Sequence, residues 1–193
     1  MRLKILAVGE PVLRKEAQGL SKEQILSPSI RDLVEHMRET LRDAPGVGLA
    51  APQIGESLRL AVIEDKADYQ KTLTEDQLRE RERRDVPFHV IVNPVIELLT
   101  KPTETFFEGC LSLPGFTALV SRAKAVRVHC LDHRGEPRVI EASGWYARIL
   151  QHEIDHLNGT LYIDQMQTRS FSSLDNYTRH WKDRQQGRSG VRE

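Results

Sequence analysis

The segment QHEIDHLNG, residues 151–159, constrains this chain more than any other stretch. It holds His152, Glu153 and His156 in the pattern H-E-x-x-H. Two histidines four residues apart lie on the same face of a helix, one above the other, so both imidazoles can bind one metal ion. The glutamate of such a pattern contacts water on the metal without being a ligand. We therefore predict a metal site on a helix over residues 143–157, capped by Ser143.

A catalytic metal site needs a third protein ligand and an open position for water. The metzincin peptidases take that ligand from H-E-x-x-H-x-x-G-x-x-H, but here Tyr162 stands at the last position. A thermolysin-type site takes a downstream glutamate, and the only acid with conceivable spacing is Asp175, near a polar end of the chain. Neither peptidase pattern supplies the third ligand well.

Cys110, in the stretch EGCLS, is a better third ligand. A thiolate binds zinc or ferrous iron strongly, and Gly109 would let the backbone come close to the metal. Cys130 differs, because it lies in an alternating strand and is expected to be a small buried apolar residue. The candidate metal ligands are therefore Cys110, His152 and His156.

Composition limits the class of protein. The chain has 193 residues, with 28 Lys and Arg against 28 Asp and Glu, so no overall charge points to nucleic acid. Two cysteines do not make a disulfide scaffold, and no apolar run is long enough to span a membrane. We expect one catalytic domain over residues 1–182, a flexible polar tail over 183–193, and a cytoplasmic protein. An organellar matrix or stroma would apply if a transit peptide had been removed.

The periodicity predicts an α+β fold with mostly antiparallel strands. A helix is expected over 28–43, with Ser27 as its cap and Pro28 at its first position. Asn93-Pro94 predicts a turn inside the segment 88–99, and a glycine-proline loop is expected to end the strand of 104–116. The other predicted strands are 59–64, 123–132 with its hairpin partner RVIEA, and a short strand in TLYID.

Residues 65–86, called the charged segment below, differ in character from their neighbours. The stretch TEDQLRERERRD, residues 74–85, is nearly all charged, and Thr74 with Gln77 could form a capping box. Acids alternate with the arginines, which argues against a basic binding patch. The segment is therefore predicted to be a solvated helix or an inserted surface loop.

Three motifs together resemble those of the peptide deformylase family. GVGLAAPQ (46–53) matches G-x-G-L-A-A-x-Q, EGCLS (108–112) matches the motif of the metal cysteine, and QHEIDHLNG matches Q-H-E-x-D-H-L-x-G. They occur in the order of the family, and the likeness extends from about residue 3 to about 170. ASGW, the charged segment and LYIDQM resemble the organellar-type branch and its bacterial relatives. The resemblance implies antiparallel sheets packed around a central helix that carries the histidines.

The resemblance also implies an activity, which is hydrolysis of the formyl group from N-formylmethionine on new peptides with release of formate. Cys110, His152 and His156 would hold a divalent metal, Fe²⁺ in most of the family, with Zn²⁺, Ni²⁺ or Co²⁺ accepted. Glu153 would accept the proton of the attacking water and return it to the departing amine. The side-chain amide of Gln53 and the backbone N–H of Leu111 would stabilise the oxyanion.

Substrate contacts are expected from the glycines. Gly46 and Gly48 would let an extended peptide pair with the backbone, with Gly109 on the substrate side as well. Val47 and Ile149 would form the walls of the methionine pocket, although Ile149 could equally be plain core. The expected partners are formylmethionyl nascent peptides, with transient proximity to the ribosome and with no direct nucleic-acid or membrane binding.

Some roles stay open at this stage. Gln151 and Asp155 could support the metal site or lie on the helix surface. One alternative activity is a metallopeptidase that cuts internal peptide bonds. Another is a non-catalytic metal-binding or ribosome-associated module. A structural zinc site has four protein ligands, whereas this chain offers three good ones and keeps Glu153.

Overall fold

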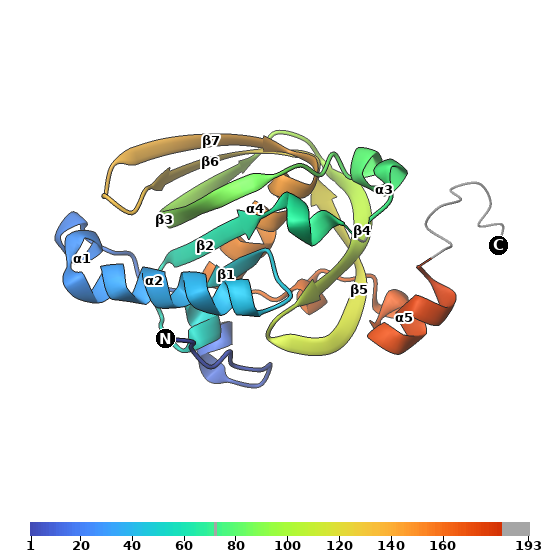
Figure 1. The fold of residues 1–193 in the computed structure, drawn as a ribbon, viewed down its shortest axis with the longest axis horizontal. Helices are drawn as coiled ribbons and strands as arrows, with labels where there is room; N and C mark the ends of the chain where they lie inside the picture. Colours follow the sequence, from blue (N-terminus) through green and yellow to red (C-terminus); the bar gives the residue numbers. More distant parts are fainter. Residues whose placement is uncertain (72, 183–193) are drawn as a thin grey trace.

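Helix α4 (Gly144–Leu157) contacts strands of two antiparallel sheets (Figure 1). A computed structural model of the chain describes residues 1–71 and 73–182, so the predicted tail lies outside the described residues. The predicted α+β class and the helix carrying the histidines are confirmed. The other α-helices of the described residues are α1 (Lys22–Leu26), α2 (Pro28–Asp43), α3 (Glu75–Glu80) and α5 (Leu174–His180).

The two sheets share no strand. The larger has the order β1-β2-β3-β6-β7, formed by β1 (Gly48–Ala50), β2 (Leu60–Asp65), β3 (Val86–Leu98), β6 (Ala125–Leu131) and β7 (Pro137–Ser143). The smaller has the order β4-β5-β8, formed by β4 (Pro102–Cys110), β5 (Leu113–Ala123) and β8 (Ser172–Ser173). Strands β1 and β4 each lie at the edge of a sheet, which matters for the cleft described below.

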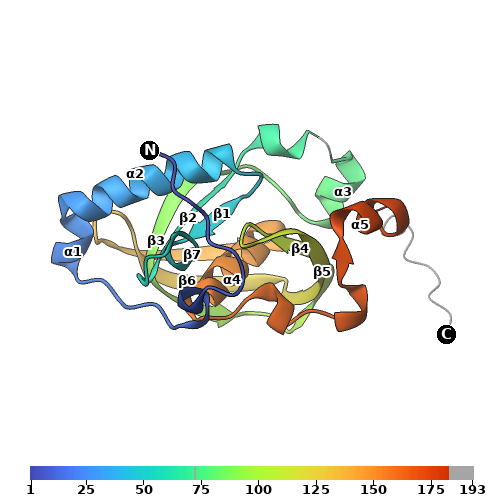
Figure 2. The same ribbon diagram turned by 90° about the horizontal axis from the view of Figure 1, so that it is seen from below.

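The larger sheet lies between α2 and α4 (Figure 2). Side chains alternate across a strand, so β2 sends Ala61 and Ile63 toward the core around α4, and Leu60 and Val62 toward the core around α2. Because both faces are covered, all six residues of β2 are buried. This double burial explains the apolar run over residues 60–63, whereas the buried carboxylates of Glu64 and Asp65 are paired with Arg42 and Arg83.

Helix α2 begins and ends as the sequence predicts. The Ser27 hydroxyl accepts a hydrogen bond from the N–H of Ile30, and Pro28 takes the first helical position. The buried stripe consists of Val34, Met37, Thr40 and Leu41. The predicted helix of 28–43 is confirmed.

Helix α4 starts at the predicted residue by a different mechanism. Ser143 is at the cap position but makes no capping hydrogen bond through its side chain. Instead, the N–H of Trp145 donates to the carbonyl of Arg81 at 2.8 Å. Gly144 has φ +61°, and a Cβ there would lie 2.5 Å from Cβ of Glu82. Ser143 is therefore at the predicted cap position, but its side chain makes no capping bond, and the backbone of the charged segment supplies that contact.

The predicted turn at Asn93-Pro94 is wrong. Strand β3 continues through it with a shift in register between Val92 and Val95, and Asn93 has φ +50°. The Asn93 side chain accepts from the N–H of Leu20 at 2.9 Å and donates to its carbonyl at 2.8 Å. The turn-forming residues thus make a bulge that is stabilised by a distant part of the chain.

Of three further predictions, the glycine-proline loop and the strand in TLYID are wrong, and the hairpin after residue 123 is correct. Pro114 and Gly115 lie within β5 and not in a loop after the strand, because β4 and β5 form a tight hairpin in which Cys110 pairs with Leu113. TLYID contains a 3-10 helix, Tyr162–Asp164, and no strand. The hairpin of β6 and β7 is confirmed, with Val126, Val128 and Cys130 buried on one face.

The charged segment contains a 3-10 helix, Ala67–Gln70, and α3, whose predicted Thr74–Gln77 capping box is present. No residue of α3 is buried, as expected for a solvated helix. Within the described part of the chain, none of the helices has the length and apolar character needed to cross a membrane.

Candidate metal centre and peptide cleft

Three potential metal ligands converge between α4 and the end of β4. The ligand atoms of Cys110, His152 and His156 all lie within 4.8 Å of one another, and Sγ of Cys110 is 3.2 Å from Nε2 of His156. Tetrahedral coordination with bonds of about 2.0–2.3 Å places ligand atoms about 3.5 Å apart. The three side chains therefore fit one metal ion and leave a position for water.

The buried carboxylate of Glu108 orients His152. Its Oε2 lies 3.0 Å from Nδ1 of His152, which leaves Nε2 of that ring for the metal. Arg122 donates two hydrogen bonds to Glu108, both of 3.0 Å, and Arg148 donates another. Although burial by itself raises the pKa of Glu108, His152 and Arg122 hold it well below its ordinary value. The carboxylate is therefore a fixed anion behind the metal site.

Glu153 has the opposite environment. Its side chain is buried, and Oε2 has no hydrogen-bond partner among the described residues. Burial raises the pKa of Glu153 to about 7. The Glu153 carboxylate can lie here only because residue 48 is a glycine, since a Cβ at Gly48 would lie 2.2 Å from Oε1 of Glu153. Glu153 thus has a carboxylate able to exchange a proton near neutral pH.

The amide of Gln53 is held with its NH₂ toward the cysteine. Oε1 of Gln53 accepts from the N–H of Ala50 at 2.9 Å, and Nε2 donates to Oγ of Ser112 at 3.2 Å and to Sγ of Cys110 at 3.6 Å. The N–H of Ser112 also points to Sγ, at 3.4 Å. These contacts hold Sγ of Cys110 and the NH₂ of Gln53 beside each other.

A cavity of about 640 Å³ opens in front of these groups. Strand β1 and the residues before it form one wall, and the end of β4 forms another. Both strands have an unpaired edge within the described sheets, so an extended peptide could form backbone hydrogen bonds with either. The cleft is suited to a peptide whose N-terminal end reaches the metal ligands.

Every predicted site residue except His156 lies along this cleft. It is lined by Gly46, Val47, Gly48, Gln53, Gly109, Cys110, Leu111, Ile149, His152 and Glu153. His156 is buried behind Cys110. Ile149 is both a cleft residue and part of the core, so neither of its two predicted roles excludes the other.

Sequence reasoning missed the charged groups behind the site. Glu108 lies inside the EGCLS motif, and this position was the available signal, whereas Arg122 and Arg148 carry no local signal. Gln151 and Asp155 support the fold rather than form a free surface. The Gln151 amide bonds to the N–H and carbonyl of Ala123, at 3.0 and 2.9 Å, and Asp155 forms an ion pair with Arg122.

Comparison with known proteins gives a consistent result. Residues 2–172 match the family model described as Polypeptide deformylase. The chain is 45% identical over 172 residues to a chloroplastic peptide deformylase 1A of Solanum lycopersicum, covering 89% of this chain and 62% of that protein. It is 46% identical over 180 residues to peptide deformylase 3 of Streptomyces avermitilis, covering 93% of this chain and 78% of that protein.

A solved structure has the same fold. The Met-Ala-Ser-bound class I type b peptide deformylase of Acinetobacter baumannii superposes with a TM-score of 0.75 at 30% identity, covering 86% of this chain and 99% of that one. The predicted resemblance, including its organellar and bacterial relatives, is confirmed. The chain spans somewhat less than two thirds of the length of the plant relatives it matches.

Proposed function

Since the chain belongs to the polypeptide deformylase family, we propose that it hydrolyses the formamide of N-formylmethionine at the start of new polypeptides and releases formate. One observation carries this proposal: a cluster of three potential metal ligands and a buried glutamate whose Oε2 lacks a partner lie at a cleft between two strand edges that are unpaired within the described sheets. We take residues 1–182 as one catalytic domain.

Cys110, His152 and His156 would hold the metal. A divalent ion bound there would lower the pKa of water and polarise the formyl carbonyl. We propose Fe²⁺ as the resident ion, with Zn²⁺, Ni²⁺ or Co²⁺ as possible replacements, because a thiolate with two imidazoles suits all of them.

Glu153 moves the proton. Its carboxylate takes a proton from the attacking water and delivers it to the departing amine of the methionine. Burial brings its pKa to about 7, where one group can act as base and then as acid at neutral pH. Its lack of a partner at Oε2 leaves that atom available for the exchange.

Gln53 and Leu111 stabilise negative charge on the formyl oxygen. Nε2 of Gln53 is preoriented, because Oε1 already accepts from Ala50. The N–H of Leu111 is the second donor, next to Cys110 in the turn between β4 and β5. Loss of one such donor costs about 3–4 kcal/mol of transition-state stabilisation.

The peptide itself binds between the strand edges. Gly46, Val47 and Gly48 contact its backbone from one side, and Gly109 from the other. Backbone pairing accepts many sequences, so discrimination depends on the first side chain, which enters an apolar pocket beside Val47 and Ile149. Nascent formylated chains near the ribosome are the proposed substrates, in the cytoplasm or in an organelle.

Formate release tests this function. The protein would be purified without oxygen in the presence of Fe²⁺ and incubated with formyl-Met-Ala-Ser. We expect formate from the wild type, none from Glu153→Ala with its metal retained, and none from Cys110→Ala with its metal lost. A folded, metal-loaded wild type that releases no formate would refute the proposal. Cleavage of internal bonds in unformylated peptides would instead favour the metallopeptidase, which the matching family and relatives do not favour.

A further inference from the structure

Two arginines share the carboxylate of Glu108 behind the candidate metal ligands. Arg122 contacts both oxygens, since its Nε and Nη2 each donate at 3.0 Å. Arg148 donates only to Oε1, whereas Oε2 is the oxygen that contacts Nδ1 of His152. The fork of Arg122 therefore fixes the direction of the carboxylate, and Arg148 adds a second positive charge more than a second constraint.

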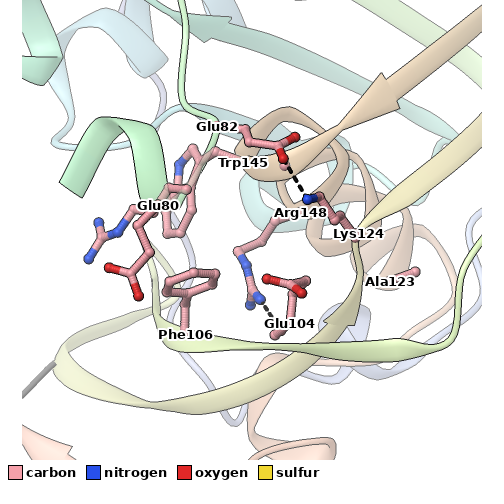
Figure 3. A pocket seen from close by; sticks show the side chains of 10 residues that line it. Glu80, Glu82, Glu104, Phe106, Ala123, Lys124, Trp145 and Arg148 are labelled. Carbon is pink, nitrogen blue, oxygen red and sulfur yellow. Dashed lines mark hydrogen bonds and ion pairs between the residues drawn. The ribbon is translucent and has the colours of Figure 1, made fainter. Parts of the chain in front are cut away.

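Groups without charge hold the other side of the Arg148 guanidinium. Nη1 donates to the carbonyl of Val120 at 3.0 Å, and Nη2 donates to the carbonyl of Glu104. Figure 3 shows the side chain beside the rings of Phe106 and Trp145, whose centroids lie 5.2 and 5.7 Å from the guanidinium carbon. Carbonyl oxygens and aromatic faces attract a cation but do not neutralise it. The charge of Arg148 is therefore balanced elsewhere.

The ion pairs behind the metal ligands form a neutral cluster. Arg148 pairs with Glu108, and Arg122 pairs with both Glu108 and Asp155. Burial lowers the pKa of Arg148, but a guanidinium stays protonated in proteins because its pKa begins above about 12. Two positive and two negative side chains thus cancel. Removal of any one of them leaves a net charge close to His152.

The sign of that net charge has consequences for a metal site. Without Arg148, excess negative charge would lie behind His152 and hold a divalent cation more tightly. The same excess would oppose the negative charge that develops on the formyl oxygen during hydrolysis. Metal affinity and rate should therefore change in opposite directions.

We propose that Arg148 is a positioning residue that acts through Glu108: it cancels the excess negative charge behind His152 and so favours hydrolysis over tight metal binding. This inference rests on the proposed deformylase function. It separates the two arginines, because Arg122 orients the carboxylate and Arg148 sets the charge of the cluster.

The first test is Arg148→Met, which keeps an unbranched side chain between the aromatic rings and removes the charge. The dissociation constant for Co²⁺ is measured by competition with a chelator, and kcat is measured by formate release from formyl-Met-Ala-Ser. We expect Co²⁺ to bind about tenfold more tightly and kcat to fall about tenfold, since a unit charge about 10 Å away at an effective dielectric constant of about 20 has effects of this size. Equal or weaker Co²⁺ binding in the folded variant overturns the proposal.

The second test changes the charge of the same cluster in the other direction. Asp155→Asn leaves an excess positive charge and should weaken Co²⁺ binding severalfold, and combination with Arg148→Met should bring the affinity back toward the wild-type value. If the arginines only stabilised the fold, both single variants would bind Co²⁺ less tightly and the double variant least tightly of all. That result would contradict the charge balance. An unchanged affinity in Asp155→Asn would contradict it too, even if Arg148→Met did not fold.

Conservative and control variants complete the design. Arg148→Lys keeps the charge and should restore both the Co²⁺ affinity and kcat toward the wild-type values. Arg127→Met is the matched control, because the Arg127 side chain is 37% exposed and also pairs with two acids, Glu97 and Glu141. It should change neither measurement. A wild type that binds Co²⁺ but releases no formate refutes the proposed function, whereas an active wild type with unshifted affinities in the variants refutes the role of Arg148.

Discussion

Two buried glutamates near the candidate metal ligands have opposite surroundings. The exposed fractions of Glu108 and Glu153 are 6% and 4%, so burial does not distinguish them. Glu108 accepts hydrogen bonds from His152, Arg122 and Arg148. Glu153 leaves Oε2 without a partner among the described residues.

The difference appears in their pKa values. Burial raises the pKa of Glu153 to about 7. The same burial acts on Glu108, yet His152 and Arg122 reverse its effect and keep the pKa below the ordinary range. The hydrogen-bonding and charged partners of each glutamate, and not its degree of burial, therefore decide which carboxylate stays an anion and which can exchange a proton. Exchange of each acid for its amide tests this contrast.

Glu153→Gln should have the largest effect on rate. Loss of a positioned acid and base lowers kcat by about 10²–10⁴-fold. The metal content and the free energy of unfolding should change little, because Oε2 makes no hydrogen bond that could be lost. Formate release, metal analysis and denaturant unfolding are the measurements. A variant that keeps its rate would remove Glu153 from the proton transfer.

Glu108→Gln should mainly lower stability. Removal of the anion leaves Arg122 and Arg148 as buried charges, both with side chains about 5% exposed or less. Breaking such a buried network costs about 3–5 kcal/mol, and loss of the His152 contact should weaken metal binding about 10–100-fold. Urea unfolding and metal titration measure the two effects. Unchanged values for both would refute the supporting role.

Asp155→Asn should lower the free energy of unfolding by less than Glu108→Gln does. Asp155 pairs with Arg122, but its side chain is 20% exposed, and Arg122 keeps its bonds to Glu108. The expected loss in free energy of unfolding is about 1 kcal/mol. A loss as large as that of Glu108→Gln would show that the network depends equally on both acids.

The smallest effect on the free energy of unfolding is expected at Glu64, which lies away from the candidate metal ligands. Its contribution can be tested by varying the pH. The hydrogen bond from Arg42 lowers the pKa of Glu64 below its ordinary value of 4.5. A carboxylate whose pKa is lowered by folding stabilises the fold at pH values above its ordinary pKa. This contribution is lost as the pH falls below about 4.5 toward the folded-state pKa of Glu64. Because the Arg42 side chain is 41% exposed, the contribution should be about 1 kcal/mol or less.

The variant for this test is Glu64→Gln. Its free energy of unfolding should be below that of the wild type at pH 7, and the difference should shrink toward pH 3. A difference that stays constant over this range would mean that Glu64 stabilises the protein by packing and not by its charge.

The elements that the sequence predicts correctly depend on neighbours in the chain. Ser27 with Pro28 and Thr74 with Gln77 define helix starts through contacts within one turn. The alternation of Val126, Val128 and Cys130 defines a strand face in the same way. Two of the predictions that failed, the turn at Asn93 and the side-chain cap at Ser143, concern positions whose hydrogen-bond partners come from distant segments.

The amino-acid sequence by itself determined the α+β class and the helix that carries the histidines, and it predicted Cys110 as the third metal ligand, since spacing and motif order are properties of the chain alone. Only the tertiary structure decided what surrounds these groups. Glu108 meets Arg148 forty residues later, and the charged segment caps α4 and stacks on Trp145. Such contacts depend on how sheets and helices pack, so no local pattern specifies them.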